Sequence, residues 1–348
     1  MADTDTSSNM PVDIPGAIPG HVDRHAEPVM GMGVEAVEAF VVPTGEKPKR
    51  QSVWRVFSSM PLLVKLSTMW LFIVLFAAVY GQLDATVFDG NLPLLQDPNL
   101  QQNNFNPETG EFGTGEPLEG PSASHWLGTD ALARDTFSRL VHGAWVTVVV
   151  VSVSVAFGFF IGGGLGSLVG FVRGRTETII MSLIDVILAF PALILLLALV
   201  SIFEVRDLLI ISMVIGFLSI PAYTRVARAN SLAISNREFV TAARAIGTKP
   251  RRILMREIVP NVVPTILAYA MVAAALVVVV EGTLSFLGLS VQLPTSTWGN
   301  MINQARRDIK VDPWQVLYPS LALTFTVLAL NQVGDFFQKR AAVRAAAL

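Results

Sequence analysis

The chain has 348 residues, of which 52% are hydrophobic and only 15% are charged, with a formal net charge of −2 and no cysteine. Soluble globular proteins carry about 25% charged residues, so this composition excludes an ordinary soluble domain and favours several membrane-spanning helices. The lack of cysteine excludes disulfides, thiolate metal sites and cysteine nucleophiles.

Residues 1–60 are rich in Pro, Gly, Ser and Asp and show no sustained apolar period, which predicts a largely disordered cytosolic tail. Residues 61–83 form the first apolar run and are the first predicted transmembrane helix. This run begins too deep in the chain for a signal peptide. Lysines and arginines precede it, and since basic residues are retained on the cytoplasmic side, they place the N-terminus inside.

Residues 84–141 are predicted to be an extracytoplasmic loop region, because acidic side chains are frequent there and basic ones are few. Between residues 96 and 121, the many Asn, Gln, Gly and Pro residues predict irregular structure. The loop leads into residues 142–340, where five further apolar runs predict a five-helix core.

The second apolar run, Val146 to Val172, carries a glycine at every fourth position from 158 to 170. On a helix these four glycines form one ridge, which lets a neighbouring backbone approach closely. This run is therefore predicted to pack tightly against another helix.

The third apolar run, residues 179–203, contains Asp185 and Pro191. A carboxylate inside a membrane span is by default a functional-site hypothesis, here a passage or gate, and pairing with a base such as Arg225 is the structural alternative. Glu281 lies near the outer end of the fifth run, where it either takes part in a gate or simply reaches water.

A basic stretch, residues 235–260, lies between the fourth and fifth runs, and its arginines and lysine place it in the cytoplasm. Ser235 and Glu238 predict a capping box that opens a short helix, and Gly247 is the predicted stop of that helix. Pro250 fits the first turn of the next helix. Alanines leave the short helix with few protruding side chains, which predicts insertion into a cleft of another protein.

The last apolar run covers residues 316–333 and is followed by Lys339, Arg340 and Arg344. Residues 341–348 are the predicted cytosolic C-terminal tail. Six spans with basic residues at both ends of the series predict that both termini are cytoplasmic.

Two stretches resemble signatures of a known family. The basic stretch resembles the cytoplasmic EAA loop of ABC-importer permeases, whose pattern is occupied here by Thr241, Ala242, Ala243, Gly247 and Pro260. Thr241 stands where that loop usually has an acidic residue. The segment from His125 to Arg139 resembles the HxxGTDxxGRD signature of the dipeptide/oligopeptide/nickel permeases, C-type subunit, with Ala133 in place of a glycine. Its matching residues include Gly128, Thr129, Asp130, Arg134 and Asp135.

The resemblance covers roughly residues 60–340 and implies an all-α polytopic membrane protein with six transmembrane helices, the type I ABC importer permease fold. It implies a subunit that forms half of the translocation pathway for di- or oligopeptides in a bacterial inner membrane. The implied partners are a second permease subunit in a hetero-dimer, two cytosolic ATPases, an extracytoplasmic binding protein and the lipid bilayer. Nucleic acid is not among them.

No GxxxxGK[ST] phosphate loop occurs in the sequence, so the chain is predicted to have no ATP site, cofactor or catalytic residue of its own. ATP and magnesium are expected in the partner ATPases. A lone His125 without a second ligand at useful spacing predicts no metal site. Coupling to the ATPases is assigned, through the resemblance, to Arg237, Glu238, Thr241, Ala242, Ala243, Gly247, Arg251 and Pro260. The passage or gate is assigned to Asp185, Pro191 and Glu281.

Three alternatives remain at this point. Related systems that import nickel or another small solute share the same motifs. A stand-alone secondary transporter would usually show paired repeats with interrupted helices, which the basic stretch and the six spans disfavour. An intramembrane enzyme would need a nucleophile beside a base, and although Ser182 and Ser212 lie in predicted spans, those spans contain no histidine.

Overall fold

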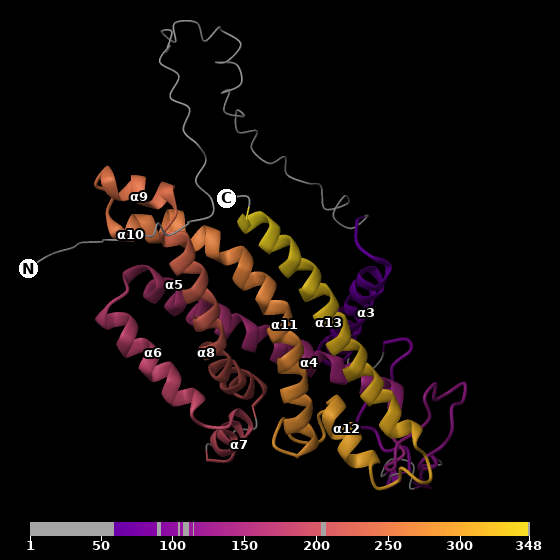
Figure 1. Cartoon of the computed structure of the whole chain (residues 1–348). Coiled ribbons are helices and arrows are strands. Elements are labelled where there is room, and N and C mark those ends of the chain that lie inside the picture. Colours follow the sequence, from indigo (N-terminus) through magenta and orange to yellow (C-terminus); the bar gives the residue numbers. More distant parts are fainter. Residues whose placement is uncertain are drawn as a thin grey trace, which may run out of the picture. The chain divides into compact units, whose positions relative to one another are not determined.

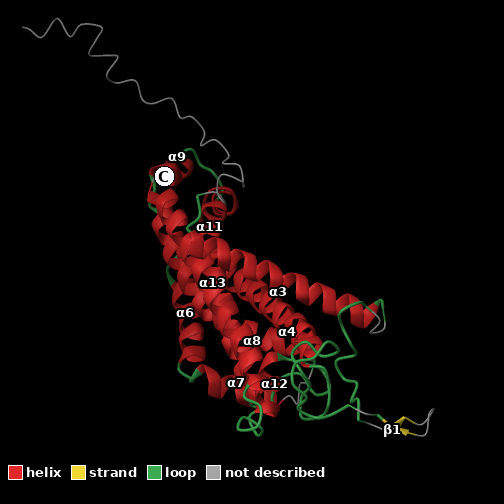
Figure 2. Cartoon of the chain, turned by 90° about the vertical axis from the view of Figure 1, so that its right-hand side faces the viewer, coloured by secondary structure: helices red, strands yellow, loops and turns green. Residues whose placement is uncertain are grey.

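The computed structural model describes residues 59–88, 92–103, 105–106, 111–113, 115–202 and 207–346 (Figure 1). Most of the predicted tail at residues 1–60 lies outside the described residues. Most of the described chain is helical, and long loops gather around α12 (Trp298–Ala305) (Figure 2). Two short antiparallel strands, β1 (Phe105–Asn106) and β2 (Glu111–Phe112), lie in one of these loops.

Within the described residues, five helical segments are long and apolar enough to cross a membrane. A sixth crossing exists if the bent pair of α6 (Arg175–Leu188) and α7 (Ala192–Ile202) counts as one span. This agrees with the predicted polytopic all-α fold. The five segments are α3 (Leu62–Thr86), α4 to α5 (Thr136–Val172), α8 (Leu208–Ser235), α10 to α11 (Pro250–Phe286) and Trp314–Ala341 of α13 (Trp314–Ala346).

The second span begins ten residues before its predicted start at Val146, because α4 (Thr136–Phe157) opens on a strong cap. The Asp135 carboxylate accepts a hydrogen bond from the Ser138 amide at 2.7 Å, which satisfies a backbone donor of the first turn. Helices therefore extend into both ends of the predicted loop region 84–141, since α3 also continues to Thr86.

The glycine ridge packs against α8 as predicted. It spans a π-helical turn, η1 (Gly158–Gly162), and α5 (Gly163–Val172). A Cβ atom added at Gly166 would lie 2.3 Å from the Thr224 carbonyl oxygen of α8, and one added at Gly162 would lie 2.7 Å from the Ile220 oxygen. Only glycine permits this backbone approach, so the two helices are in direct contact along the ridge.

The third run, predicted as one span, forms two helices in the structure. α6 and α7 meet at 83°, on either side of a break that ends at Pro191. Proline disfavours helical geometry in the residue before it, here Phe190, and Pro191 then precedes the first turn of α7. A proline in an apolar run has thus bent this chain, whereas Pro221 lies inside a continuous α8.

The basic stretch folds as two short helices and a π-helical turn before the next span. These elements are α9 (Glu238–Ala245), α10 (Pro250–Ile253) and η2 (Leu254–Ile258), and η2 continues directly into α11 (Val259–Phe286). The predicted capping box is wrong: Ser235 still belongs to α8, and its hydroxyl donates to the Ser231 carbonyl oxygen at 2.7 Å. Arg237 occupies the N-cap position of α9 without a side-chain cap bond.

The predicted stop of α9 at Gly247 is confirmed. Gly247 has a φ of +75°, a conformation that glycine adopts without steric cost. Its amide donates to the Arg244 oxygen at 3.0 Å, and the Thr248 amide donates to the Ala243 oxygen at 3.1 Å. Together these bonds form the Schellman turn that ends many helices. Pro250 begins α10, also as predicted.

The last helix, α13 (Trp314–Ala346), is longer than the predicted run at 316–333 and includes most of the predicted tail at 341–348. Alanine is the best helix former, and the end of the chain is rich in it, so the helix continues beyond the apolar run. α9 and α12 lie at opposite ends of α11 (Figure 1). A helix of 28 residues is about 40 Å long, so these ends are well separated.

Candidate functional site

α9 is held in place by one buried face. Val240 is completely buried and packs in a cluster with Phe171 of α5 and Ile253 and Ile258 from the following turns. The guanidinium carbon of Arg244 lies 5.4 Å from the centroid of the Phe171 ring, within the range of a cation–π contact. The short helix is therefore attached to the ends of the neighbouring spans rather than held only by its two connections.

The opposite face of α9 is exposed and apolar. Phe239 is 38% exposed and Ile246 is 82% exposed, and with Ala242 they follow the i, i+3, i+7 spacing of one helical stripe. The sequence prediction placed contact on the alanines and did not include these two larger residues, although their spacing in the sequence was the signal. Ala243 is only partly exposed, because it packs against the cluster around Val240.

The other residues assigned to coupling lie on the same connected segment. Ala242 and Gly247 are exposed on α9 and its final turn, and the rest continue along the surface from the N-cap of α9 to the start of α11. The Thr241 hydroxyl lies 3.5 Å from the Arg237 carbonyl oxygen of its own helix. The remaining residues assigned to coupling, all exposed, are Arg237, Glu238, Thr241, Arg251 and Pro260.

Asp185 pairs with Arg225, the alternative that the sequence left open. The Asp185 carboxylate accepts a hydrogen bond from the Arg225 guanidinium at 2.7 Å. Both side chains are more than half exposed, at 60% and 54%. A second ion pair, between Glu177 and Arg228, also joins α6 to α8. Ionisable residues within membrane spans usually face a bundle interior or water-filled cavity, so this outward face is unsuited to lipid.

An apolar pocket of about 360 Å³ lies between α7, α8 and α11. Its wall includes Tyr223 and Tyr269, whose rings meet edge to face with centroids 5.1 Å apart. The buried Tyr223 hydroxyl has no hydrogen-bond partner within the described part of the chain. Pro191 precedes the helix that forms one wall, while Asp185 and Glu281 are not among the lining residues.

One expectation from the sequence was that Glu281 reaches water. The structure contradicts it, because Glu281 is completely buried in α11. One carboxylate oxygen accepts a hydrogen bond from the Ser285 hydroxyl at 2.7 Å. The Thr297 hydroxyl in turn donates to the Ser285 oxygen at 2.9 Å. Thr297 caps α12 through the Asn300 amide, so Glu281 belongs to a polar joint between α11 and α12.

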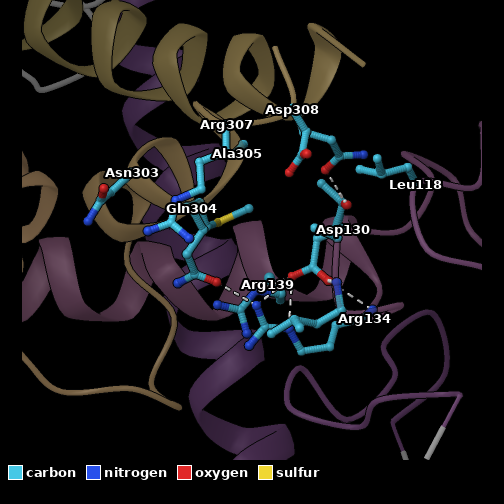
Figure 3. A pocket seen from close by; sticks show the side chains of 14 residues that line it. Leu118, Asp130, Arg134, Arg139, Asn303, Gln304, Ala305, Arg307 and Asp308 are labelled. Atoms are coloured by element: carbon cyan, nitrogen blue, oxygen red, sulfur yellow. Dashed lines mark hydrogen bonds and ion pairs between the residues drawn. The ribbon is translucent and has the colours of Figure 1, made fainter. Parts of the chain in front are cut away.

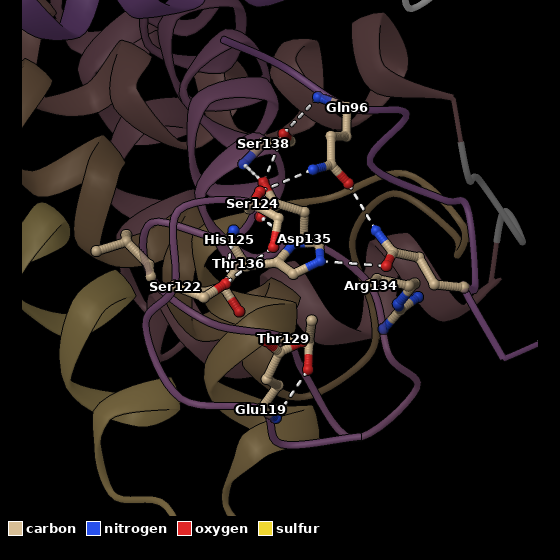
Figure 4. Close-up of polar contacts among 12 residues, drawn as sticks. Gln96, Glu119, Ser122, Ser124, His125, Thr129, Arg134, Asp135, Thr136 and Ser138 are labelled. Carbon is tan, nitrogen blue, oxygen red and sulfur yellow. Dashed lines mark hydrogen bonds and ion pairs between the residues drawn. The ribbon is translucent and has the colours of Figure 1, made fainter. Parts of the chain in front are cut away.

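The loop motif at residues 125–139 forms a dense polar network (Figure 4). Gly128 has a φ of +74°, and a Cβ atom there would lie 2.2 Å from the Glu119 oxygen, so only glycine fits. Thr129 is buried; its hydroxyl donates to the Glu116 oxygen at 2.7 Å and accepts from the Glu119 amide at 2.9 Å. These bonds tie the motif to the loop that precedes it.

Asp135 links this loop to α4. Its Oδ2 accepts hydrogen bonds from both the amide and the hydroxyl of Ser138, at 2.7 and 2.6 Å. Its Oδ1 lies 3.1 Å from Nδ1 of His125, and Nε2 of that imidazole lies 3.1 Å from Oε1 of Gln102 (Figure 4). His125 is therefore engaged by a carboxylate and an amide.

Asp130 organises the turn around Ala133. Its Oδ1 accepts from the amides of Leu132 and Arg134, and its Oδ2 lies 2.6 Å from a guanidinium nitrogen of Arg134. Ala133 is buried with a φ of +53°. This left-handed conformation favours glycine, which explains why the resembled signature usually has glycine at this position.

The amino-acid sequence of this chain matches a known protein family. Residues 162–345, just over half of its length, match the family of "binding-protein-dependent transport system inner membrane component" proteins. The chain belongs to this family. It is also 38% identical over 217 residues to the glutathione transport system permease protein GsiD of Pectobacterium atrosepticum, covering 62% of this chain and 72% of the relative. The same protein from Escherichia coli is 38% identical over 216 residues, covering 62% and 71%.

The permease is therefore a multi-pass inner-membrane subunit of an ABC importer, and its family role is transport rather than an enzymatic reaction. The matched region contains α9, the bent pair α6 and α7, and the apolar pocket. The loop motif at residues 125–139 precedes this region.

Proposed function

We propose that this permease is one of two transmembrane subunits of an ATP-driven importer of di- or oligopeptides, and that α9 docks on a cytosolic ATPase. The observation that carries the proposal is the construction of α9. One face is anchored by the buried Val240, and the other presents Phe239 and Ile246 to a partner. Exposed aromatic and aliphatic residues on a rigid helix are the usual anchors of a helix that binds in a groove.

The distribution of basic residues supports a cytoplasmic α9 end. Lysines and arginines follow α5, fill the segment around α10 and continue along the end of α13, and such residues are retained on the cytoplasmic side. With six crossings, both termini lie on that side. The residues are Arg173, Arg175, Lys249, Arg251, Arg252 and Lys339.

Movement of α9 would reach the membrane through a nearly continuous helix. α10, η2 and α11 follow one another without an intervening loop from Pro250 to Phe286. Because Val240 packs against Ile253 and Ile258 in one cluster, a displacement of α9 displaces the start of α11 with it. The partner ATPase thus drives a rigid-body tilt of a helix that forms one wall of the apolar pocket.

The outward ion pair between Asp185 and Arg225 supports a second permease subunit and a shared passage. Two charged side chains that point out of a single subunit need water or protein beside them. We place the partner permease against α6 and α8, so that the ion pair lies along the passage and Pro191 marks the bend of its wall. Glu281 lies instead in the buried joint with α12.

A peptide cargo is supported by the relatives. The proteins named as glutathione transport permeases share 38% of residues over about 70% of their length, and glutathione is a tripeptide. We expect an external binding protein to select the peptide, and we expect this chain to supply half of the path without binding ATP.

The docking role is tested by Gly247→Arg in the complete transporter reconstituted in nanodiscs. An arginine at the end of α9 should abolish association of the ATPase subunits and peptide uptake, because a long charged side chain obstructs the docking face. Gly288→Arg is the matched control: Gly288 also has a φ of +75° and open space where a Cβ atom would lie, but it follows the other end of α11.

Both variants introduce the same side chain into the same backbone conformation, so backbone strain affects them equally. The Gly288 variant should retain wild-type ATPase association, measured by co-purification. Equal association of the ATPases with both variants would refute docking through α9. Uptake by the permease without any ATPase subunit would refute the importer function itself.

A further inference from the structure

A polar pocket of about 360 Å³ opens at the α12 end (Figure 3). Its walls come from the loop that contains Leu118 and Asp130, the start of α4, the end of α12 and the turn before α13. None of its lining residues belongs to α7, α8 or α11, so it is separate from the apolar pocket between those helices.

Two arginines that line this pocket are buried. Arg134 is 4% exposed and Arg139 is 1% exposed. Asp130 is the carboxylate beside both: its Oδ2 lies 2.6 Å from Nη2 of Arg134 and 3.6 Å from Nε of Arg139. One carboxylate thus serves two buried guanidinium groups, and the contact to Arg139 is the longer one.

The remaining contacts leave two donors unused. Nη1 of Arg139 donates to the Pro98 oxygen at 2.9 Å, and Oε1 of Gln304 accepts from Arg134 at 2.5 Å. Within the described residues, Nη2 of Arg139 and Nε2 of Gln304 are buried without a hydrogen-bond partner. Leaving a buried charged donor unpaired costs more than leaving a neutral one, so the two atoms need an acceptor.

The chemistry of that acceptor follows from the lining. Both unused atoms are N–H donors, and a carboxylate offers two oxygens that suit a guanidinium group. The ionisable lining residues are Arg134, Arg139 and Arg307 against Asp130 and Asp308, which leaves an excess of positive charge. Charge and hydrogen-bonding capacity both select an anionic acceptor.

We propose that this pocket receives an aspartate or glutamate side chain of the external binding protein. The partner's identity rests on the proposed importer function, while the carboxylate preference rests on the pocket alone. A protein side chain fits better than the transported solute, because the pocket lies among loops and α12 and is not lined by the helices of the proposed passage.

The test uses the complete transporter in nanodiscs and measures the affinity of its binding protein. Gln304→Glu places a carboxylate inside the pocket while keeping an oxygen acceptor for Arg134, so the fold should be retained. Binding-protein affinity should fall at least about tenfold, because the pocket is then already neutralised. Lys310→Gln is the control: it removes a positive charge from the same surface, and Lys310 does not line the pocket.

Replacing acidic residues of the binding protein one at a time by their amides identifies the group that enters. One replacement should lower the affinity for the wild-type permease as much as Gln304→Glu does. The same replacement should cause no further loss of affinity for the Gln304→Glu permease, as expected for two groups in one interaction. Acetate should compete with the binding protein more strongly than chloride at equal ionic strength.

Three results would overturn the inference. If the Gln304 and Lys310 variants bind the binding protein equally well, the pocket has no part in docking. If acetate competes but no acidic residue of the binding protein matters, the occupant is a free carboxylate solute. If the wild-type complex shows no stimulation of ATP hydrolysis by the binding protein, the proposed function fails, and this partner fails with it.

Discussion

The two ends of the permease are built on different physical principles. At the α9 end, a short helix is anchored by apolar burial around Val240 and leads through η2 into a long span. At the α12 end, long loops are held by charge-assisted hydrogen bonds around Asp130 and Asp135. Apolar packing on a continuous helix passes on rigid-body motion, whereas a hydrogen-bonded loop keeps polar groups in fixed positions for recognition.

This contrast predicts that the α12 end depends most on single polar residues. Asp135→Ala removes the cap of α4 and leaves the Ser138 hydroxyl and the His125 imidazole without their carboxylate partner. We expect a loss of about 3 kcal/mol in the free energy of unfolding, from the cap and from buried groups left unpaired. Thermal unfolding of the purified permease, followed by tryptophan fluorescence, measures the loss.

Asp135→Asn serves as the control for that experiment, because the amide oxygen still accepts at the cap. Its loss in the free energy of unfolding should be less than half of the loss in the alanine variant. An alanine variant as stable as the wild type would show that the polar network does not support the loop.

At the α9 end, we expect anchoring and docking to depend on two different, neighbouring residues. Val240→Ala removes buried methyl groups and should cost about 2 kcal/mol locally, loosening α9. Phe239→Ala changes an exposed ring, so stability should stay within about 0.5 kcal/mol, while ATPase affinity should fall about tenfold.

Hydrogen exchange of the α9 amides and ATPase co-purification distinguish the two effects. Exchange should rise in the Val240 variant alone, and ATPase affinity should fall in both. If Phe239→Ala left the affinity unchanged, the exposed stripe would not be the docking face.

The smallest expected effect concerns the strained turn of the α12 end. Ala133→Gly relieves a left-handed conformation at φ +53°, and should raise stability by up to about 1 kcal/mol after the greater chain entropy of glycine is included. Ala133→Val should lower stability instead, because β-branching is poorly tolerated there. The same unfolding measurement compares the variants, and a more stable valine variant would contradict the reasoning.

Local patterns in the sequence were sufficient for much of the fold. The apolar runs predicted the crossings, the four-residue spacing predicted the glycine ridge, and Gly247 predicted the end of α9. Each of these depends on hydropathy or on backbone sterics within a few residues, which neighbours far along the chain do not change. The two signature motifs extended this to the family, which the comparisons confirm.

Only the tertiary structure decided which polar groups meet. The predicted cap at Ser235 failed because its hydroxyl bonds within α8, and the bend at Pro191 could not be distinguished by sequence from the continuous helix at Pro221. The burial of Glu281 depends on Thr297 and α12, and the pocket depends on Gln304 lying beside Arg134. The contact between Gln304 and Arg134 joins residues 170 positions apart, and burial and pairing arise only once packing brings such residues together.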